Sequence, residues 1–447
     1  MAAFDVQDFI DRRKVGATHV TTLTLCTAMM FVDGLDVFMV GKIAPAIAQG
    51  FGEPTSSMTI VFLLQQIGLA VGAFVTTPMA DRFGRKRMMV LSAAVFAVLT
   101  LAAGFAQSLL QLAILRGLAG LFLSGMVPIT MALAAEAAPA KRRATFIAVI
   151  MVGYSLGSAA GGAIAAWLID DFGWRSGFWV AGLLPLVVAP LMLLMVPESL
   201  QYMVNRNPAD PRIPRVLRRF SPDLSLTGTE LFVVGDGSAK RGKAKLLDIF
   251  REGRARPTTI IWLCCLLSMG NIALLAAWMP SFFQEMAGIP IQRFAVTAMI
   301  ALTCGVAGTL SMGWLLDRVR PSRLIPVFYL ANAALLVTLG SVAFDSPMFL
   351  WVLMAWSFSQ TGGQSGLNMV MTQIYPASTR STGVGWAGGA GRIGGIIAPL
   401  FGGLALASHM SLQQTLMIIA LPPVAVALLV TLLGGTRRTP KPELAAA

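Results

Sequence analysis

The stretch MADRFGRKR at residues 79–87 decides the fold, because a variant of it, LLDRVRPSR, returns at residues 315–323. Each copy follows a long apolar run, and each places one acid, Asp81 or Asp317, directly before an arginine. The two acids lie 236 positions apart, which is more than half of the 447 residues. The second part of the chain therefore looks like a repeat of the first.

A second motif repeats at nearly the same spacing. Residues 136–139 read EAAP and precede Arg143, while Tyr375 and Pro376 precede Arg380, which lies 237 positions after Arg143. Agreement between two separate motifs favours an internal duplication. Two repeated halves are typical of transporters that rock around a site near the middle of the bilayer.

The composition excludes a soluble protein. Apolar residues make up 56% of the chain and charged residues only 12%, with a mean hydropathy of +0.73. Soluble domains carry roughly one quarter charged residues, so this chain has too few charges to cover a water-facing surface. The net charge is +13, but the basic residues lie in short clusters between apolar runs. That pattern indicates a membrane protein rather than one that binds nucleic acid.

Twelve apolar segments are long enough to cross a bilayer, which takes about 20 residues per helix. They form two sets of six and predict an all-α membrane protein. We expect an N-terminal six-helix bundle at 1–198, a cytoplasmic linker at 199–256, and a C-terminal six-helix bundle with a short cytoplasmic tail at 257–447. The predicted spans are 20–46, 58–80, 88–106, 110–134, 145–168, 177–196, 257–283, 294–316, 323–343, 347–371, 382–406 and 412–434.

The loops predict the orientation. Lys and Arg gather in the loops of one side, for example at 82–87 and 141–143, and positive loops stay in the cytoplasm. Both termini are therefore expected there. The N-terminal MAAFDVQDFIDRRK has no cleavable signal pattern, so the first span should remain in a multi-pass protein of the bacterial inner membrane. The linker holds 12 basic and 6 acidic residues, which favours a solvated connection near anionic lipid headgroups over a regulatory domain.

The DRFGRK loop, its echo and the E-x-x-P-x-x-x-R segment that begins at Glu136 resemble the signature motifs of the major facilitator superfamily. The resemblance implies two pseudo-symmetric bundles of six helices and covers nearly the whole chain. One position departs from the family pattern. Thr77 stands four residues before Asp81, where the family has glycine, whereas Gly313 fits the pattern in the second half.

The charged loops predict a cytoplasmic gate. Asp81 lies at a helix end, where it can pair with an arginine cluster that includes Arg143 and cap a helix of the other half. Such contacts would hold the cytoplasmic side closed in the outward-facing state. The predicted gating residues are Asp81, Arg82, Arg85, Glu136, Arg143, Asp317 and Arg380.

Ionisable residues inside a membrane are costly and mark functional sites. The first span contains Asp33 and Asp36, three residues apart on one helix face. Two neighbouring acids in a low-dielectric cavity should not both ionise, so one of them is a candidate proton carrier. A salt-bridged structural pair is the alternative. Lys42, near the outer end of the same span, is interpreted as a structural residue that snorkels to the interface.

Two arginines also lie within spans, Arg116 in the fourth and Arg392 in the eleventh, and both have glycine neighbours. A guanidinium binds both oxygens of a carboxylate, so Arg392 is a predicted substrate ligand. Pairing with a helix carbonyl or an acid is the alternative. Arg116 lies nearer Asp33 in the expected helix order and is assigned to proton coupling, with substrate binding or a structural role as alternatives.

A polar stripe marks the tenth span, where Gln360, Gln364 and Asn368 recur every four residues. Such a stripe either lines a cavity or joins helices by hydrogen bonds. Together with tryptophans, it suits a ligand with an aromatic body and polar substituents. The other predicted substrate-binding residues are Asn271, Trp278, Trp356 and Trp386.

The segments DGLD at 33–36, GRIGG at 391–395 and PES at 197–199 resemble the aromatic acid:proton symporter family, a branch of that superfamily. The resemblance implies proton-driven import of an aromatic carboxylate such as a hydroxybenzoate, protocatechuate or gallate. Leu35 replaces the aromatic residue that is usual in the family. The functional residues that the resemblance carries over are Asp33, Asp36, Arg116, Arg392 and Arg380.

Three other functions fit the same scaffold: import of another organic anion or sugar acid, proton-driven efflux, and nutrient sensing without transport. The spans show no nucleophile–base or metal-ligand constellation, so neither an enzyme nor a metal or cofactor site is expected. We expect a monomer whose partners are a small aromatic or organic anion, protons and the lipid bilayer, and not nucleic acid.

Overall fold

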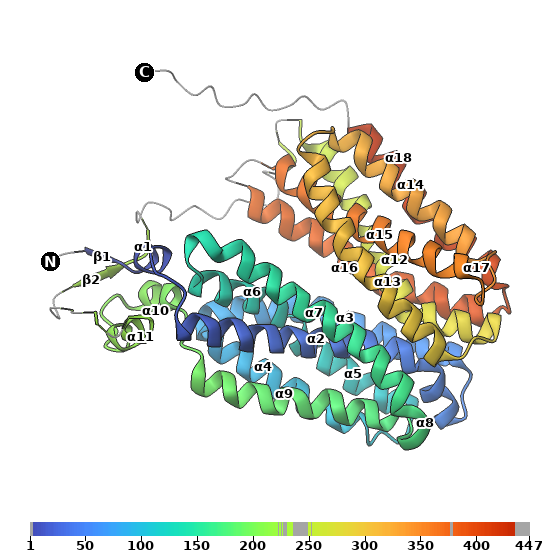
Figure 1. The fold of residues 1–447 in the computed structure, drawn as a ribbon, viewed down its shortest axis with the longest axis horizontal. Helices are drawn as coiled ribbons and strands as arrows, with labels where there is room; N and C mark the ends of the chain where they lie inside the picture. Colours follow the sequence, from blue (N-terminus) through green and yellow to red (C-terminus); the bar gives the residue numbers. More distant parts are fainter. Residues whose placement is uncertain are drawn as a thin grey trace. The chain divides into compact units, whose positions relative to one another are not determined.

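A computed structural model of the chain describes residues 3–221, 223–224, 226, 230–235, 249–251, 253–375 and 379–433, and most of these residues are helical (Figure 1). The helices before the linker are α1 (Val6–Asp11), α2 (Ala17–Phe51), η1 (Thr55–Met58), α3 (Thr59–Phe83), α4 (Arg85–Ala103), α5 (Leu109–Leu123), α6 (Met126–Ala137), η2 (Ala140–Arg142), α7 (Arg143–Trp167), α8 (Ile169–Phe172) and α9 (Arg175–Met195). The linker adds α10 (Leu200–Arg206) and α11 (Ile213–Phe220). The helices after it are α12 (Ala255–Ala287), α13 (Ile291–Leu316), α14 (Pro321–Leu339), α15 (Pro347–Ile374), α16 (Arg380–Ala407), α17 (Leu412–Ile419) and α18 (Leu421–Leu433).

Eleven helical segments within the described residues are long and apolar enough to cross a membrane. They coincide with eleven of the twelve predicted spans. The remaining predicted span, 347–371, lies in the 28-residue helix α15, which is long enough to cross but carries three glutamines and several other polar residues along its length. The predicted all-α membrane fold is therefore confirmed, and the one helix with weak hydropathy is the helix with the polar stripe.

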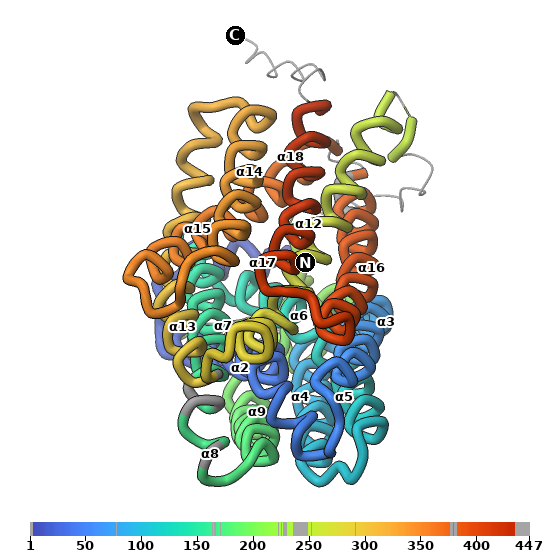
Figure 2. The backbone as a smooth tube through the Cα atoms, turned by 90° about the vertical axis from the view of Figure 1, so that its right-hand side faces the viewer, coloured from blue at the N-terminus to red at the C-terminus, as the bar shows by residue number. Residues whose placement is uncertain are grey.

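The chain divides into two compact units. The first comprises residues 1–241, 276–296 and 399–407, and the second comprises residues 242–275, 297–398 and 408–447. The first unit thus contains all the helices before the linker together with the ends of α12 and α16 and the beginning of α13. Figure 2 shows α14 of the second unit beside α15 and α18, in agreement with the extensive contacts of α14 with each of them.

Glycines allow α2 and α7 to pack at backbone distance in the first unit. A Cβ at Gly34 would overlap the carbonyl group of Tyr154, and a Cβ at Gly157 would overlap that of Phe31. Small residues are what lets membrane helices approach so closely. This close packing fixes the face of α2 that carries the first-span acids.

The linker differs from the solvated connection that the sequence predicts. Strand β1 (Ala3–Asp5) pairs in parallel with β2 (Leu231–Val233), with Phe4 opposite Phe232. Helices α1, α10 and α11 pack around them, because their apolar residues form one buried cluster of their own. The members of that cluster are Val6, Ile10, Leu200, Met203, Val204, Ile213, Leu217 and Phe232. Residues 236–248 of the linker lie outside the described residues.

Candidate functional site

A buried ion pair joins α2 to α5 in the first unit. Both guanidinium nitrogens of Arg116 donate to Asp36, with Nη1–Oδ1 and Nη2–Oδ2 distances of 2.8 and 2.6 Å. Both side chains are at most 1% exposed, and the Phe178 ring of α9 lies 5.8 Å from the guanidinium carbon. A bidentate pair is the strongest geometry for these groups. The negative charge of Asp36 is thus matched inside the bundle.

Asp33 is different, although it lies one helical turn away on the same helix. It is 2% exposed, and its Oδ2 atom has no hydrogen-bond partner among the described residues. An ionised carboxylate in such a place lacks compensation, whereas a protonated one carries no net charge. The sequence placed Arg116 near the first-span acids, and the structure pairs it with Asp36 and not with Asp33.

Uncharged side chains of α12, α14 and α15 in the second unit are joined by hydrogen bonds. We call this group, Ser268, Tyr329, Gln364 and Asn368, the neutral polar wall. The Ser268 hydroxyl of α12 donates to Gln364 Oε1 on α15 at 2.6 Å and shares a second hydrogen bond of 2.6 Å with the Tyr329 hydroxyl of α14. Gln364 Nε2 in turn donates to Asn368 Oδ1 at 3.1 Å. Asn368 is exposed, and in a membrane-spanning helix an exposed amide is favourable only where water reaches it. The predicted tenth-span stripe thus joins helices through Gln360 and Gln364, while Asn368 is exposed.

Three of the predicted substrate ligands are engaged with protein groups instead. Gln360 Oε1 accepts a hydrogen bond from Asn332 Nδ2 of α14 at 2.7 Å. Asn271 Nδ2 donates to the Ile419 carbonyl at 2.8 Å. Trp278 is fully buried in the first unit, where its indole donates to the Pro399 carbonyl at 2.9 Å. These contacts hold helices together.

The remaining predicted ligands lie in the second unit. Arg392 is partly buried on α16 beside Gly391, where a Cβ would strike Met269 of α12, so the two helices pack closely at this level. Trp386 lies one and a half turns earlier on α16, is 45% exposed and stacks on Trp262 with 6.0 Å between ring centroids. The indole N–H of Trp356 is buried and has no partner among the described residues.

Two of the predicted gating residues, Arg85 and Glu136, meet at the end of α6. Arg85, the first residue of α4, forms an ion pair with Glu136, and the Ser199 hydroxyl donates to the same carboxylate. The neighbouring Glu198 accepts a hydrogen bond of 2.9 Å from the backbone N–H of Lys86. This network ties the DRFGRK loop to the start of the linker. Ser199 and Glu198 were in the PES segment noted in the sequence, but their roles could not be assigned from it.

The expected pairing of Asp81 with Arg143 is wrong. Arg143 instead donates to Asp11 of α1 at 2.6 Å and to the Ala135 carbonyl at 3.0 Å. Asp81 is largely exposed and lies 3.9 Å from Arg85, one turn along the chain. Asp11 was missed because three aspartates crowd the N-terminus and the sequence does not show which of them meets an arginine.

Two other predicted gating residues, Arg82 and Asp317, lie at the surface. The Arg82 guanidinium lies over the Phe83 ring at 5.5 Å, and the backbone carbonyl of Arg82 accepts a hydrogen bond from the Tyr202 hydroxyl at 3.2 Å. Asp317 is exposed in the second unit, directly after α13. Arg380 begins α16, but its side chain lies outside the described residues.

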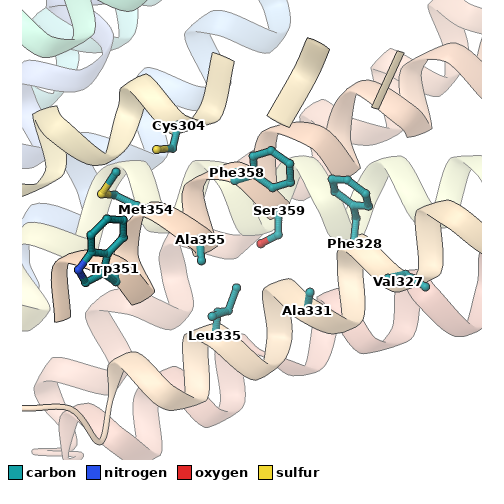
Figure 3. A pocket seen from close by; sticks show the side chains of 10 residues that line it. All are labelled: Cys304, Val327, Phe328, Ala331, Leu335, Trp351, Met354, Ala355, Phe358 and Ser359. Carbon is teal, nitrogen blue, oxygen red and sulfur yellow. The ribbon is translucent and has the colours of Figure 1, made fainter. Parts of the chain in front are cut away.

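An apolar cavity of about 520 Å³ between α13, α14 and α15 is not the candidate site. Figure 3 shows Cys304, Val327, Phe328, Trp351 and Phe358 around it, with Ser359 as a polar group. The lining contains no charged residue and none of the predicted ligands. Val327 and Trp351 are exposed, so the cavity opens to the face that α14 and α15 present to their surroundings.

Among the described residues, no group of three or more His, Cys, Asp or Glu side chains is placed to hold a metal ion. Cys26, Cys264 and Cys265 are buried and form no disulfide.

The comparisons with known proteins cover nearly the whole chain. Residues 26–399 match the model of the Major Facilitator Superfamily. A protein of Pseudomonas putida described as a gallate transporter is 32% identical over 445 residues, which is 100% of this chain and 98% of that protein. The 4-hydroxybenzoate transporter PcaK of Acinetobacter baylyi is 30% identical over 429 residues, covering 96% of this chain and 93% of its own.

Solved structures give the same fold. A bacterial homologue of the human lysosomal transporter Spinster superposes with a TM-score of 0.73 at 17% identity, covering 94% of this chain and 97% of its own. The xylose transporter XylE of E. coli superposes with a TM-score of 0.70 at 15% identity, covering 92% and 98%. At these identities the likeness establishes the arrangement of helices alone.

Proposed function

The chain belongs to the major facilitator superfamily and, within it, to the aromatic acid:proton symporter family, and from that premise we propose that it imports a hydroxylated aromatic carboxylate together with protons. One observation carries the substrate class: the similarity to transporters named for gallate and 4-hydroxybenzoate extends over essentially the full length of each chain. Gallate, protocatechuate and 4-hydroxybenzoate share a carboxylate, one ring and ring hydroxyls.

The neutral polar wall supports a hydroxylated substrate. Hydroxyl groups both donate and accept hydrogen bonds, and so do the amides of Gln364 and Asn368. Sites built to hydrogen-bond a hydroxyl discriminate strongly against the analogue that lacks it. We assign Arg392 to the carboxylate, because a guanidinium binds both of its oxygens. Trp356 and Trp386 are proposed to offer flat surfaces to the ring.

Proton coupling is assigned to Asp33. Its buried carboxyl has an oxygen without a partner, so closing the bundle around it is least costly when it carries a proton. Asp36 and Arg116 already neutralise each other and position α2 against α5. Proton binding at Asp33 and substrate binding together would then permit the halves to rock. Release of the proton at the higher cytoplasmic pH would be followed by release of the anion.

The gate is assigned to the contacts that the structure contains. Arg85 with Glu136, and Arg143 with Asp11, would break and re-form as the cytoplasmic side opens and closes. We propose that the protein works as a monomer in the bacterial inner membrane. The clusters of Arg and Lys in the loops support a cytoplasmic location for both termini.

Uptake by proteoliposomes tests this proposal. The purified full-length protein is reconstituted, and radiolabelled 4-hydroxybenzoate, protocatechuate and gallate are supplied outside with an inward proton gradient. We expect accumulation of at least one acid above its external concentration, and its collapse when a protonophore dissipates the gradient. Accumulation that is indifferent to the protonophore contradicts proton coupling, and absence of uptake for all three acids contradicts the substrate class.

A further inference from the structure

Lys42 is a partly buried cation within a membrane-spanning helix, and the proposed mechanism does not use it. It lies nine residues before the end of α2, which places it about 13 Å from that helix end at the usual rise per residue. The sequence interpretation expected it to snorkel to the interface. Instead, its Nζ atom turns into the bundle and donates to the Ser158 carbonyl of α7 at 2.5 Å.

The surroundings of Lys42 combine elements from both sequence halves within the first unit. The Lys42 Nζ atom and Ala295 of α13 both lie within 3.5 Å of where a Cβ of Gly162 would be. The preceding residue, Gly41, packs against the carbonyls of Ala276 and Ala277 on α12. Transporters of this architecture bind their substrates where the repeats meet. The ammonium group therefore lies at the meeting place of helices α2, α7, α12 and α13.

The charge of Lys42 is not matched by an acid. The ion pairs found among the described residues do not include it, and its one hydrogen-bond partner there is a neutral carbonyl. An ammonium group has three donors, so two of them are available to another acceptor. A buried cation held by a single carbonyl is costly, and inside a membrane such a group is a functional candidate by default.

The charges of α2 and α5 link proton binding to anion binding. Asp36 and Arg116 cancel each other, which leaves Asp33 and Lys42. When Asp33 is ionised, its charge and that of Lys42 sum to zero. When Asp33 takes up a proton, one positive charge is left over, and one carboxylate neutralises it. A proton and an anion thus restore the balance together, and either one alone disturbs it.

We propose that Lys42 is a second carboxylate-binding residue of the transport path, which attracts the substrate anion when Asp33 is protonated and returns to the Ser158 carbonyl when the anion has left. This assignment rests on the proposed import of aromatic carboxylates. It identifies the substrate as a monoanion bound with one proton on the first half of the chain. It also makes the lysine a specificity-determining residue for charged over neutral ligands.

Binding by the full-length protein in nanodiscs tests the assignment. The two ligands are 4-hydroxybenzoate and its neutral amide, 4-hydroxybenzamide, which have the same ring and hydroxyl. Lys42→Gln keeps a donor for the Ser158 carbonyl and removes the charge, whereas Lys42→Arg keeps the charge. The matched control is Lys141→Gln, which changes an exposed lysine in the loop after α6.

We expect Lys42→Gln to raise the Kd of the acid about tenfold or more and to leave the Kd of the amide unchanged. The Kd values of Lys42→Arg for both ligands should stay within about threefold of those of the wild type, and the Kd values of Lys141→Gln should equal those of the wild type. A Lys42→Gln protein that binds the acid as the wild type does overturns the assignment. So does an equal loss for acid and amide, which would make the lysine structural.

Two further outcomes keep the test decisive. If Lys42→Gln does not fold, the comparison moves to Lys42→Arg, where a folded protein without preference for the acid over the amide overturns the assignment. If the wild type binds none of the aromatic acids, the proposed substrate class fails instead, and that result does not depend on Lys42.

Discussion

The polar groups of the two units follow different chemistry. On α2 and α5 of the first unit they are charged: Asp33, Asp36 and Arg116 are deeply buried, and Lys42 is partly buried. On α12, α14 and α15 of the second unit they are neutral hydroxyls and amides, joined from Tyr329 through Ser268 to Gln364 and Asn368. Buried acids and bases can change charge by binding or releasing protons, whereas neutral hydrogen-bonding groups distinguish ligands by their shape and substituents. The difference suggests that energy coupling resides mainly in the first unit and recognition of ring substituents in the second.

The largest effect is expected where a buried charge loses its partner. Arg116→Met leaves Asp36 uncompensated and should destabilise the protein by about 3–5 kcal/mol, because both groups are removed from water. Thermal unfolding in detergent measures the loss. The double variant Asp36→Leu with Arg116→Met should recover most of the unfolding temperature. If the single variant unfolds at the wild-type temperature, the pair does not stabilise the first unit as the geometry indicates.

The next effect is on coupling rather than folding. Asp33→Asn keeps the size of the side chain, removes the titrating group and should retain the fold, because this acid has no ionic partner among the described residues. We expect accumulation driven by the proton gradient to vanish, while exchange of labelled for unlabelled substrate continues. Glu53→Gln, an exposed acid after α2, serves as the control. Undiminished accumulation by Asp33→Asn would place the proton elsewhere.

A smaller effect distinguishes recognition from coupling. Gln364→Leu removes the amide that links Ser268 to Asn368 and should raise the KM for 4-hydroxybenzoate about five- to tenfold, the equivalent of one hydrogen bond of about 1 kcal/mol. The KM for benzoate, which lacks the hydroxyl, should change little. Gln360→Leu is the comparison on the same helix, since its amide is bound to Asn332, and it should lower stability without changing the preference. Equal changes for both acids would remove Gln364 from hydroxyl recognition.

The smallest effect is expected at the partly exposed charges of the gate. The side chains of Arg143 and Asp11 are 38% and 27% exposed, so solvent screens their attraction. Asp11→Asn should cost about 0.5 kcal/mol or less and change the rate of transport less than about threefold. Initial uptake rates and unfolding temperatures measure both quantities. A loss of stability as large as that of Arg116→Met would show that burial does not explain the different strengths of the two ion pairs.

Much of this organisation is predictable from the sequence, for identifiable reasons. The spans follow from apolar length, and the helix with the weakest hydropathy, α15, is also the one whose glutamines recur every fourth residue. Asp33, Asp36 and Arg116 stand out because a charge in hydrocarbon is rare. Each of these signals depends only on neighbours along one helix.

What the sequence could not supply is which residues on different helices meet. Arg116 pairs with Asp36 and not with Asp33 because of how α2 is rotated against α5. The two acids are only three residues apart, and the sequence does not show which of them faces the arginine. Arg143 meets Asp11 because α1 folds back beside the end of α6, and no motif marks that return. Ser268, Tyr329 and Asn332 lie in apolar runs with few other polar residues, and the sequence does not show which residues of other helices they meet.

The pairing of β1 with β2 sets an order of assembly. Residues 3–5 are synthesised before the helices of the first half, whereas their partners at 231–233 are synthesised after all of them. The beginning of the chain must therefore wait, unpaired, through six rounds of insertion into the membrane before this small sheet can form. Residues added in front of Ala3 would lie beside this late-forming sheet, so a tag at the carboxyl end is the safer choice for purification.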